Sequence, residues 1–270
     1  PGYCPVVGLM CCPDRGVEVP AISENPTRRE VRDAVKVLEN LIADFPFVDQ
    51  ASHANALAIL FSILLRPVIS GHVPLAIVDA PMQGTGKSLL VTVLGMIAVG
   101  NVAAESIPSK NNDDEWRKKI TSILLNSSPF VLLDNIPDNT TIDSPPLAAA
   151  LTAREWSDRR LGKNETIRVP SRSVWVATGN NLRVAGDMPR RCYSIRLDAN
   201  LAKPWERSGF KIDDLEKHVA DHRSELLAAA LTVIRGWFSQ GKPQARVPVF
   251  GSVVEWSPTV GSVLEVAGVR

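Results

Sequence analysis

Residues 81–88, which read PMQGTGKS, have the composition and spacing of a phosphate-binding loop. Glycines let the backbone approach phosphate oxygens, so that its N–H groups can wrap them. Lys87 would reach the β- and γ-phosphates, and Ser88 would offer a hydroxyl to Mg²⁺. Pro81 replaces the usual first glycine, but that position mainly sets the turn, so we expect the loop to work. The residues assigned to nucleotide binding are Gly84, Thr85, Gly86, Lys87 and Ser88.

An acidic residue closes a second apolar stretch, residues 129–136. Asp134 stands where a Mg²⁺-orienting carboxylate is expected, although a turn or helix-capping aspartate is the alternative. Many ATPases carry Glu next, whereas this chain has Asn135, which orients water but cannot accept its proton. The general base is therefore left open between Asp138 and Glu155.

Two asparagines end the apolar stretch 172–181, and two arginines follow it. We expect Asn180, ahead of Asn181, to hold the attacking water or the γ-phosphate; the alternative is a plain asparagine turn. An arginine offered to a neighbouring subunit's γ-phosphate strongly accelerates hydrolysis. We favour Arg191 over Arg190 for that role, the alternative being a solvated basic turn.

Residues 156–170 have the pattern of a β-hairpin, with polar flanks around the turn GKNE. The segment carries Arg159, Arg160, Lys163 and Arg168. In a ring of subunits, such hairpins would line the pore with positive charge, and Lys163 at the tip would contact DNA. A solvent-facing hairpin with ordinary charges is the alternative.

Short apolar stretches alternate with helical patterns and must position these side chains. Strands are expected at 73–80, 129–136, 172–181 and 192–199, with a weaker one at 100–106. This alternation predicts an α/β fold with a parallel sheet flanked by helices. Ligands bind such sheets at the edge where the strands end, so the loop, Asp134 and Asn180 should meet there.

The remaining segments divide the chain further. We expect an extended lead-in at 1–26, a helical segment at 27–72, the ATPase core at 73–200, a helical lid at 201–243 and the start of a truncated helical unit at 244–270. The pattern over 213–241 predicts one long helix. The six tryptophans are scattered, which indicates core or interface positions.

Composition narrows the class of protein. The 270 residues carry a net charge of +1, so nucleic-acid contacts must come from local basic features. The four cysteines lack zinc-like spacing, which favours free thiols. No apolar run is long enough to span a bilayer and no signal peptide is visible, so we expect a cytoplasmic location. A chain that begins at Pro1 and ends in an unstopped helical pattern is expected to be a piece of a longer polypeptide.

The order PMQGTGKS, FVLLDN, hairpin, VWVATGNN and GDMPRRCYSIRLD resembles the ring-forming AAA+ P-loop ATPases. It is most similar to the superfamily 3 and poxvirus-type primase-helicase branch found in phages and mobile elements. The resemblance spans roughly residues 27–240.

The resemblance implies an ATP- and Mg²⁺-dependent helicase that forms a homo-oligomer, a hexamer, and acts on single-stranded DNA or a DNA fork. A primase domain in the same polypeptide is also implied. It assigns nucleotide and metal to Lys87 and Ser88, Mg²⁺ to Asp134, the polar sensor to Asn180 and the finger to Arg191. Lys163 becomes the DNA contact, and Arg223 a nucleotide sensor from the lid.

Two alternatives remain from the residues. One is an ATPase switch, such as a loader or a regulator, without pore contacts. The other is a nucleotide-binding module with little hydrolysis, which Asn135 and Pro81 suggest.

Overall fold

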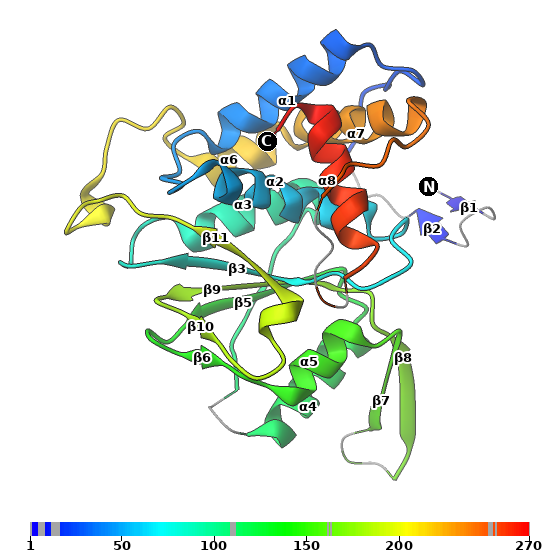
Figure 1. Cartoon of the computed structure of the whole chain (residues 1–270), viewed down its shortest axis with the longest axis vertical. Helices are drawn as coiled ribbons and strands as arrows, with labels where there is room; N and C mark the ends of the chain where they lie inside the picture. The colour runs from blue at the N-terminus through cyan, green and yellow to red at the C-terminus, as the bar shows by residue number, and fades with distance from the viewer. Residues whose placement is uncertain are drawn as a thin grey trace.

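The fold is organised around a five-stranded sheet in a computed structural model, which describes residues 2–4, 9–11, 17–108, 112–160, 162, 164–247, 251 and 253–269. Across the sheet the strands run β11 (Cys192–Arg196), β3 (Leu75–Ala80), β9 (Val174–Asn180), β5 (Phe130–Ile136) and β4 (Ala104–Glu105) (Figure 1). Each neighbouring pair is parallel. The predicted α/β class with a parallel sheet is therefore confirmed. The weak strand expected at 100–106 shrinks to two residues at the edge.

Helices cover both faces of this sheet (Figure 1). One face carries α1 (Arg28–Ile42), α2 (Gln50–Leu65), α3 (Lys87–Val99), α6 (Leu215–Asp221), α7 (Arg223–Ser239) and α8 (Trp256–Ala267). The other face carries α4 (Asp113–Leu125) and α5 (Pro145–Thr152). Two short 3₁₀ turns, η1 (Pro189–Arg191) and η2 (Pro204–Glu206), lie before and after β11.

Alternation along the strands divides the apolar side chains between two cores. In β3, Ala76 and Val78 belong to the core on the α3 side, whereas Leu75 and Ile77 belong to the core beneath α4 and α5. Successive side chains of a strand point to opposite faces, so a strand buried on both sides must be apolar throughout. This explains why the strands were recognisable as continuous apolar runs.

Local signals set several helix boundaries. The side chain of Thr27 accepts from the Glu30 amide, and the Glu30 carboxylate accepts from the Thr27 amide, so α1 begins with a capping box. The single helix expected over 213–241 is wrong, because the helical segment starts at Leu215, breaks at His222 and ends at Ser239. His222 lies outside helical geometry, at ψ +15°, and its ring nitrogen Nδ1 contacts the His218 carbonyl.

The expected hairpin is present beside α4. β7 (Glu155–Arg159) pairs antiparallel with β8 (Thr166–Pro170). Its base is fixed on α4, since Trp156 Nε1 donates to the Thr121 hydroxyl at 2.9 Å. Lys163, the predicted DNA contact, lies outside the described residues.

Smaller strand pairs complete the fold. β1 (Gly2–Cys4) pairs antiparallel with β2 (Leu9–Cys11) inside the predicted lead-in, and β6 (Thr141–Ile142) pairs parallel with β10 (Arg183–Val184). The segment expected to start a separate C-terminal unit packs into the main core through α8, where Trp256 donates to Ser62 Oγ at 2.7 Å. Within the described ranges, no helix is both long and apolar enough to cross a membrane.

Candidate functional site

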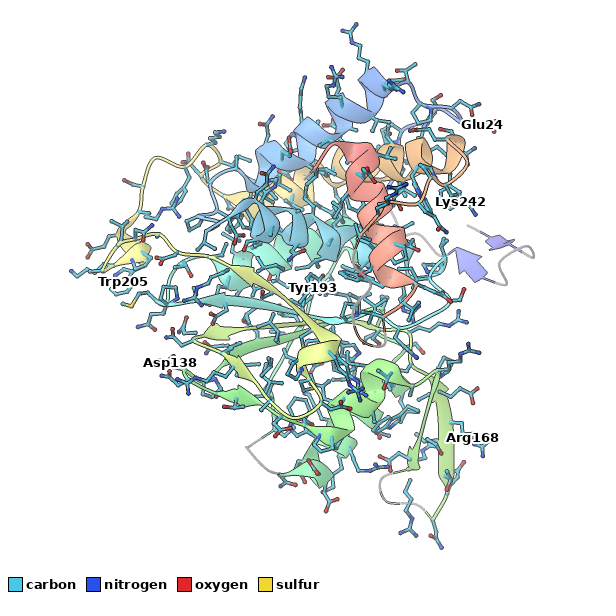
Figure 2. All side chains as sticks on the ribbon, in the orientation of Figure 1. Glu24, Asp138, Arg168, Tyr193, Trp205 and Lys242 are labelled. Carbon is cyan, nitrogen blue, oxygen red and sulfur yellow. The ribbon has the colours of Figure 1, made fainter. Side chains whose placement is uncertain are left out.

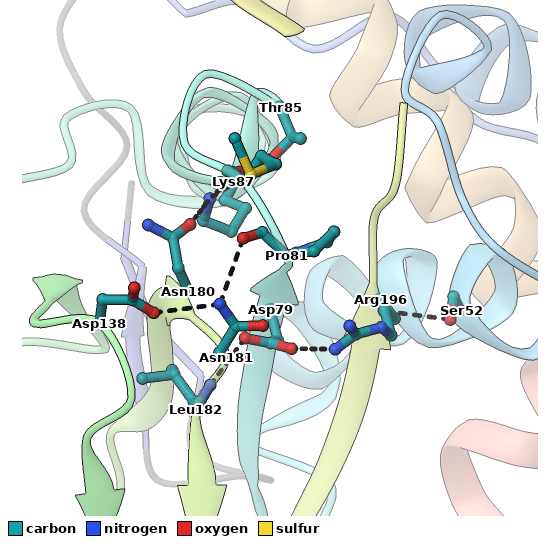
Figure 3. Close-up of polar contacts among 11 residues, drawn as sticks. Ser52, Asp79, Pro81, Thr85, Lys87, Asp138, Asn180, Asn181, Leu182 and Arg196 are labelled. Atoms are coloured by element: carbon teal, nitrogen blue, oxygen red, sulfur yellow. Dashed lines mark hydrogen bonds and ion pairs between the residues drawn. The ribbon is translucent and has the colours of Figure 1, made fainter. Parts of the chain in front are cut away.

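Four polar residues singled out in the sequence, Lys87, Ser88, Asp134 and Asn180, lie where β3, β5 and β9 end. Figure 3 shows Lys87 beside Asn180. These three strands are neighbours and parallel, so their carboxyl ends share one edge of the sheet. The glycine loop leaves β3 there, Asp134 lies near the end of β5, and Asn180 ends β9. We call this the phosphate edge.

The loop between β3 and α3 has the backbone of an anion-binding turn. Gly84 and Gly86 have φ of +77° and +91°, values that side-chain-bearing residues rarely adopt. Helix α3 begins at Lys87, and no side chain caps its first turn. Its free N–H groups and the positive end of its dipole therefore face the loop, where they favour a phosphate.

Pro81 fits at the start of this loop without a glycine. Its carbonyl oxygen accepts a hydrogen bond from Asn181 Nδ2 at 3.2 Å. The preceding residue, Ala80, is already paired with Asn180 in the β3–β9 ladder. Because the strand ladder and Asn181 hold the turn, the position does not need the freedom of glycine.

Lys87 is folded back over the loop and is only 9% exposed. Its Nζ donates to Asn180 Oδ1 at 2.7 Å, with longer contacts to Thr85 Oγ1 at 3.3 Å and the Met82 carbonyl at 3.4 Å. Burial lowers the pKa of Lys87, while the charges of Asp79 and Asp134 act in the opposite direction. The ammonium group thus sits among neutral oxygens that a phosphate can replace.

Ser88 and Asp134 form the candidate metal site. Ser88 Oγ donates to Asp134 Oδ1 at 2.6 Å, and Thr178 Oγ1 from β9 donates to the same oxygen at 2.5 Å. Hydroxyl and carboxylate oxygens are suitable Mg²⁺ ligands, and Mg²⁺ is usually bound by few protein groups together with substrate phosphates and water. No cluster of three His, Cys, Asp or Glu side chains suited to a metal occurs in the described part of the chain. Two protein oxygens beside a phosphate loop therefore fit Mg²⁺ brought in with a nucleotide.

Thr178 is the residue of this site that the sequence interpretation missed. It is 1% exposed, and the signal available in the sequence was a hydroxyl residue directly after the apolar run 174–177. Thr178 also accepts from the Asn135 amide at 3.0 Å. Asn135 has φ +54°, and the β5–β9 register shifts between Leu133 and Ile136. The backbone therefore bends where an acidic residue was expected.

The two asparagines have different partners. Asn180 contacts Lys87, as described above, whereas Asn181 Nδ2 joins the Pro81 carbonyl to Asp138 Oδ1 at 3.1 Å (Figure 3). Of the two candidate bases, Asp138 is thus at the phosphate edge. Glu155 pairs with Pro170 at the base of the hairpin, and that segment leads into the opposite end of β9.

Arg190 and Arg191 lie at the opposite edge of the sheet. They precede β11, whose first residue Cys192 pairs with Leu75 at the start of β3. With about 3.3 Å per residue, the length of β3 separates them from their own loop by roughly 17 Å. The Arg191 side chain is 11% exposed and that of Arg190 is 59% exposed, and both pair with Asp187. These hydrogen bonds, first from Arg190 and then from Arg191, lower the pKa of Asp187 to about 2.

A basic cavity of about 340 Å³ opens between the start of β3 and the hairpin base. Its lining includes the cationic side chains of Arg66, Arg154 and Arg172, together with His72. The pKa of His72 is lowered by burial and by nearby arginines, including Arg191, and is raised by Glu255. None of the three arginines lining the cavity has a carboxylate ion pair within the described ranges. The cavity therefore favours an anion.

A second cavity, of about 230 Å³, adjoins the phosphate loop at Gly84 and Gly86. It is lined by the aromatic residues Phe45, Trp205 and Phe210. Five of the six tryptophans are buried, as predicted for core positions, whereas Trp205 is 53% exposed and an interface position for it stays a prediction. Figure 2 shows Trp205 and Asp138 toward one side of the molecule, and Arg168 of the hairpin on the other.

The described hydrogen bond of Arg223 is made to helix α3 and not to the phosphate loop. Its Nε donates to the Ile97 carbonyl at 3.3 Å, which joins the start of α7 to α3.

Comparisons with known proteins give fold-level likeness only. The sequence matches no protein-family model and no curated protein. Among solved structures, the chain is similar to the apo C-terminal region of NrS-1, at 16% identity and a TM-score of 0.49, covering 95% of this chain and 55% of that one. Two structures of JCV helicase, one with an acetamide compound bound, follow at 12% and 10% identity, TM-scores of 0.40 and 0.38, and 90% coverage of this chain. The chain spans 55–61% of the length of these proteins. Similarity at this level does not support any statement about function. The function proposed below therefore depends on the geometry of the phosphate edge.

Proposed function

We propose that the chain is an ATP-hydrolysing motor subunit, a DNA helicase or translocase of a phage or mobile genetic element. The observation that carries the proposal is the meeting of Lys87, the Ser88–Asp134 pair and Asn180 at one edge, in front of an uncapped helix N-terminus. Positioning and electrostatic stabilisation are what phosphoryl transfer mainly requires.

Each side chain at the phosphate edge has a role in hydrolysis. Loop N–H groups and Lys87 bind the phosphates, and Lys87 exchanges its contact with Asn180 for a phosphate oxygen. Released Asn180 then orients the attacking water. Ser88 and Asp134 would hold Mg²⁺, which neutralises the charge that develops on the phosphate oxygens. The aromatic cavity next to Gly84 offers a place for the nucleobase.

The arginines act on the next subunit. Arg190 and Arg191 are too far from their own loop, and Arg191 lies close enough to the basic cavity for its charge to act on His72. This edge of the sheet is suited to contact the triphosphate bound by a neighbouring subunit. A site shared in this way supports assembly into a ring, which we take to be a hexamer. Exposure favours Arg190 for a contact between subunits, since the Arg191 guanidinium is largely buried. Arg191, the residue favoured from sequence, is kept as a second candidate.

DNA would contact the hairpin. β7 and β8 extend beyond α4 (Figure 1) and carry Arg159 and Arg168. Arg160 directly follows β7, and we place Lys163 at the tip. Cationic side chains projecting into a ring pore track the phosphate backbone of single-stranded DNA.

Mixing subunits tests the sharing of the site. Lys87→Ala subunits lack a working loop, and Arg190→Ala/Arg191→Ala subunits lack the trans cations, so each is expected to be inactive alone. A mixture pairs intact loops with intact arginines across some interfaces and should recover ATP hydrolysis. Full activity of the double arginine variant alone would contradict hydrolysis between subunits.

One observation favours a different function. Asn135 occupies the position after Asp134 and has a left-handed backbone, so no carboxylate follows the metal-site aspartate directly. A nucleotide-binding module that assembles on ATP but hydrolyses it little is therefore the second candidate. Tight ATP binding without turnover would identify it.

A further inference from the structure

An unexpected acid lies in the strand that feeds the phosphate loop. Asp79 is in β3, whose six residues are all buried, and it is only 7% exposed. Burying a carboxylate is costly unless its oxygens find partners. Both oxygens of Asp79 have one: Oδ1 accepts from the Leu182 amide at 2.9 Å, and Oδ2 pairs with Arg196 Nη1 (Figure 3).

The Leu182 contact ties down the turn that follows β9. The Asn181 amide donates to the Ala80 carbonyl at 3.1 Å, and the next amide, that of Leu182, donates to Asp79. Two successive amides are thus fixed on the end of β3. Asn180 directly precedes them, and its side chain contacts Lys87 at 2.7 Å. Asp79 thus adds a side-chain anchor to the turn after Asn180, beside the β3–β9 ladder in which Asn180 pairs with Ala80.

Arg196 holds the carboxylate from the neighbouring strand. It is in register with Asp79 in the β11–β3 pair, and its amide donates to Ser52 Oγ of α2 at 3.1 Å. Its side chain is 46% exposed, so the guanidinium is also accessible to water. An ion pair that only joined β3 to β11 would need one carboxylate oxygen; the other oxygen is directed at the turn.

We propose that Asp79 is a positioning residue for the nucleotide site: it holds the Leu182 amide, and through this turn it fixes Asn180 next to Lys87, while Arg196 orients the carboxylate. The inference rests on the proposed function, because it gives Asn180 its task at the γ-phosphate. In this role Asp79 acts through the turn, since its two carboxylate oxygens are bound to the Leu182 amide and to Arg196.

The test compares steady-state ATP hydrolysis of assembled wild-type protein with Asp79→Ala and Asp79→Asn. The Ala variant loses the acceptor for the turn, and misplacing a group that orients the reaction lowers kcat by about 10- to 100-fold. KM for ATP should change less than kcat, because the glycine loop and Lys87 are retained and only the nearby Asp79 charge that acts on Lys87 is lost. The Asn variant keeps an oxygen for the Leu182 amide and should retain most of kcat.

Asp158→Ala is the matched control for Asp79→Ala. The side chain of Asp158 is 15% exposed against 11% for the side chain of Asp79, and it pairs with Arg117 at 3.0 Å away from the phosphate edge. Hydrolysis without DNA should be unchanged in this variant. Wild-type kcat in folded Asp79→Ala, or an equal loss in Asp158→Ala, would overturn the proposal.

If Asp79→Ala does not fold, variants of Arg196 test the proposal instead. Arg196→Ala should lower kcat with little change in KM, and Arg196→Lys should restore part of it; wild-type kcat in Arg196→Ala would overturn the inference. A wild-type protein without Lys87-dependent hydrolysis would defeat the proposed function instead. In that case amide hydrogen exchange tests the positioning role of Asp79. The amides of residues 180–184 should exchange faster in the Asp79 or Arg196 alanine variant than in wild type. Unchanged exchange would refute the positioning role.

Discussion

The contact between the phosphate loop and the segment that carries Trp205 gives a quantitative prediction. A Cβ added at Gly84 would lie 2.9 Å from Trp205 Cβ and 3.2 Å from its amide nitrogen. Gly241, just after α7, has the same φ of +77°, and an added Cβ there meets no described atom within 4 Å. The two glycines therefore share the backbone strain and differ only in the steric contact.

The expected magnitudes follow from this comparison. Placing alanine in the left-handed region costs about 1–2 kcal/mol at either site. At Gly84 the overpacking against Trp205 adds about 1–3 kcal/mol. For a chain of this size each kcal/mol lowers Tm by about 2–4 °C, so Gly84→Ala should melt roughly 2–12 °C below Gly241→Ala.

Thermal unfolding and nucleotide binding measure both consequences. Gly84→Ala should also weaken ATP binding, because the loop must move away from Trp205, whereas Gly241→Ala should bind ATP as wild type does. In the double variant Gly84→Ala/Trp205→Gly, the closest contact disappears and the excess destabilisation should shrink. Equal melting temperatures and equal ATP affinities for the two alanine variants would refute the reasoning.

Three further predictions concern other parts of the molecule. Asp134→Asn should reduce Mg²⁺-dependent hydrolysis by at least about 100-fold, since even outer partners of a metal can cost that much, while ATP binding in chelator stays measurable; full turnover would contradict the metal assignment. Asp187 has a folded pKa of about 2, below its usual 3.8, so its ionised form stabilises the fold above about pH 4 and that contribution is lost as the pH falls toward 2. The Tm difference between wild type and Asp187→Asn should therefore be present at neutral pH and vanish near pH 2; a difference that does not change with pH would contradict the pairing with the arginines. Lys163→Ala should abolish stimulation of hydrolysis by single-stranded DNA and leave DNA-free hydrolysis unchanged, and undiminished stimulation would exclude the hairpin tip as the DNA contact.

The fold and much of the phosphate edge were predictable because local patterns encode them. Strands buried on both faces are apolar runs, and the left-handed turns at Gly84 and Gly86 require glycine. Asp134 and Asn180 follow such runs, so the parallel topology brings them to the loop. These features depend on short stretches of chain and on one rule about strand ends.

Other features depend on contacts between distant segments. Trp205 reaches Gly84 only because the segment after β11 folds back onto the loop. Asp79 and Thr178 were missed because a single polar residue in an apolar strand does not reveal its partner. Arg191 is buried against Asp187 because of the geometry of η1. The sequence shows two adjacent arginines and does not indicate which of them is buried.

ATP hydrolysis by the assembled chain tests the central claim most directly. The measurement compares wild type with Lys87→Ala, each with and without single-stranded DNA and Mg²⁺. The account predicts Mg²⁺-dependent hydrolysis that increases with DNA and disappears in Lys87→Ala. Measurable ATP binding without any turnover in the assembled protein would contradict it, and would leave Asn135 as the residue to explain.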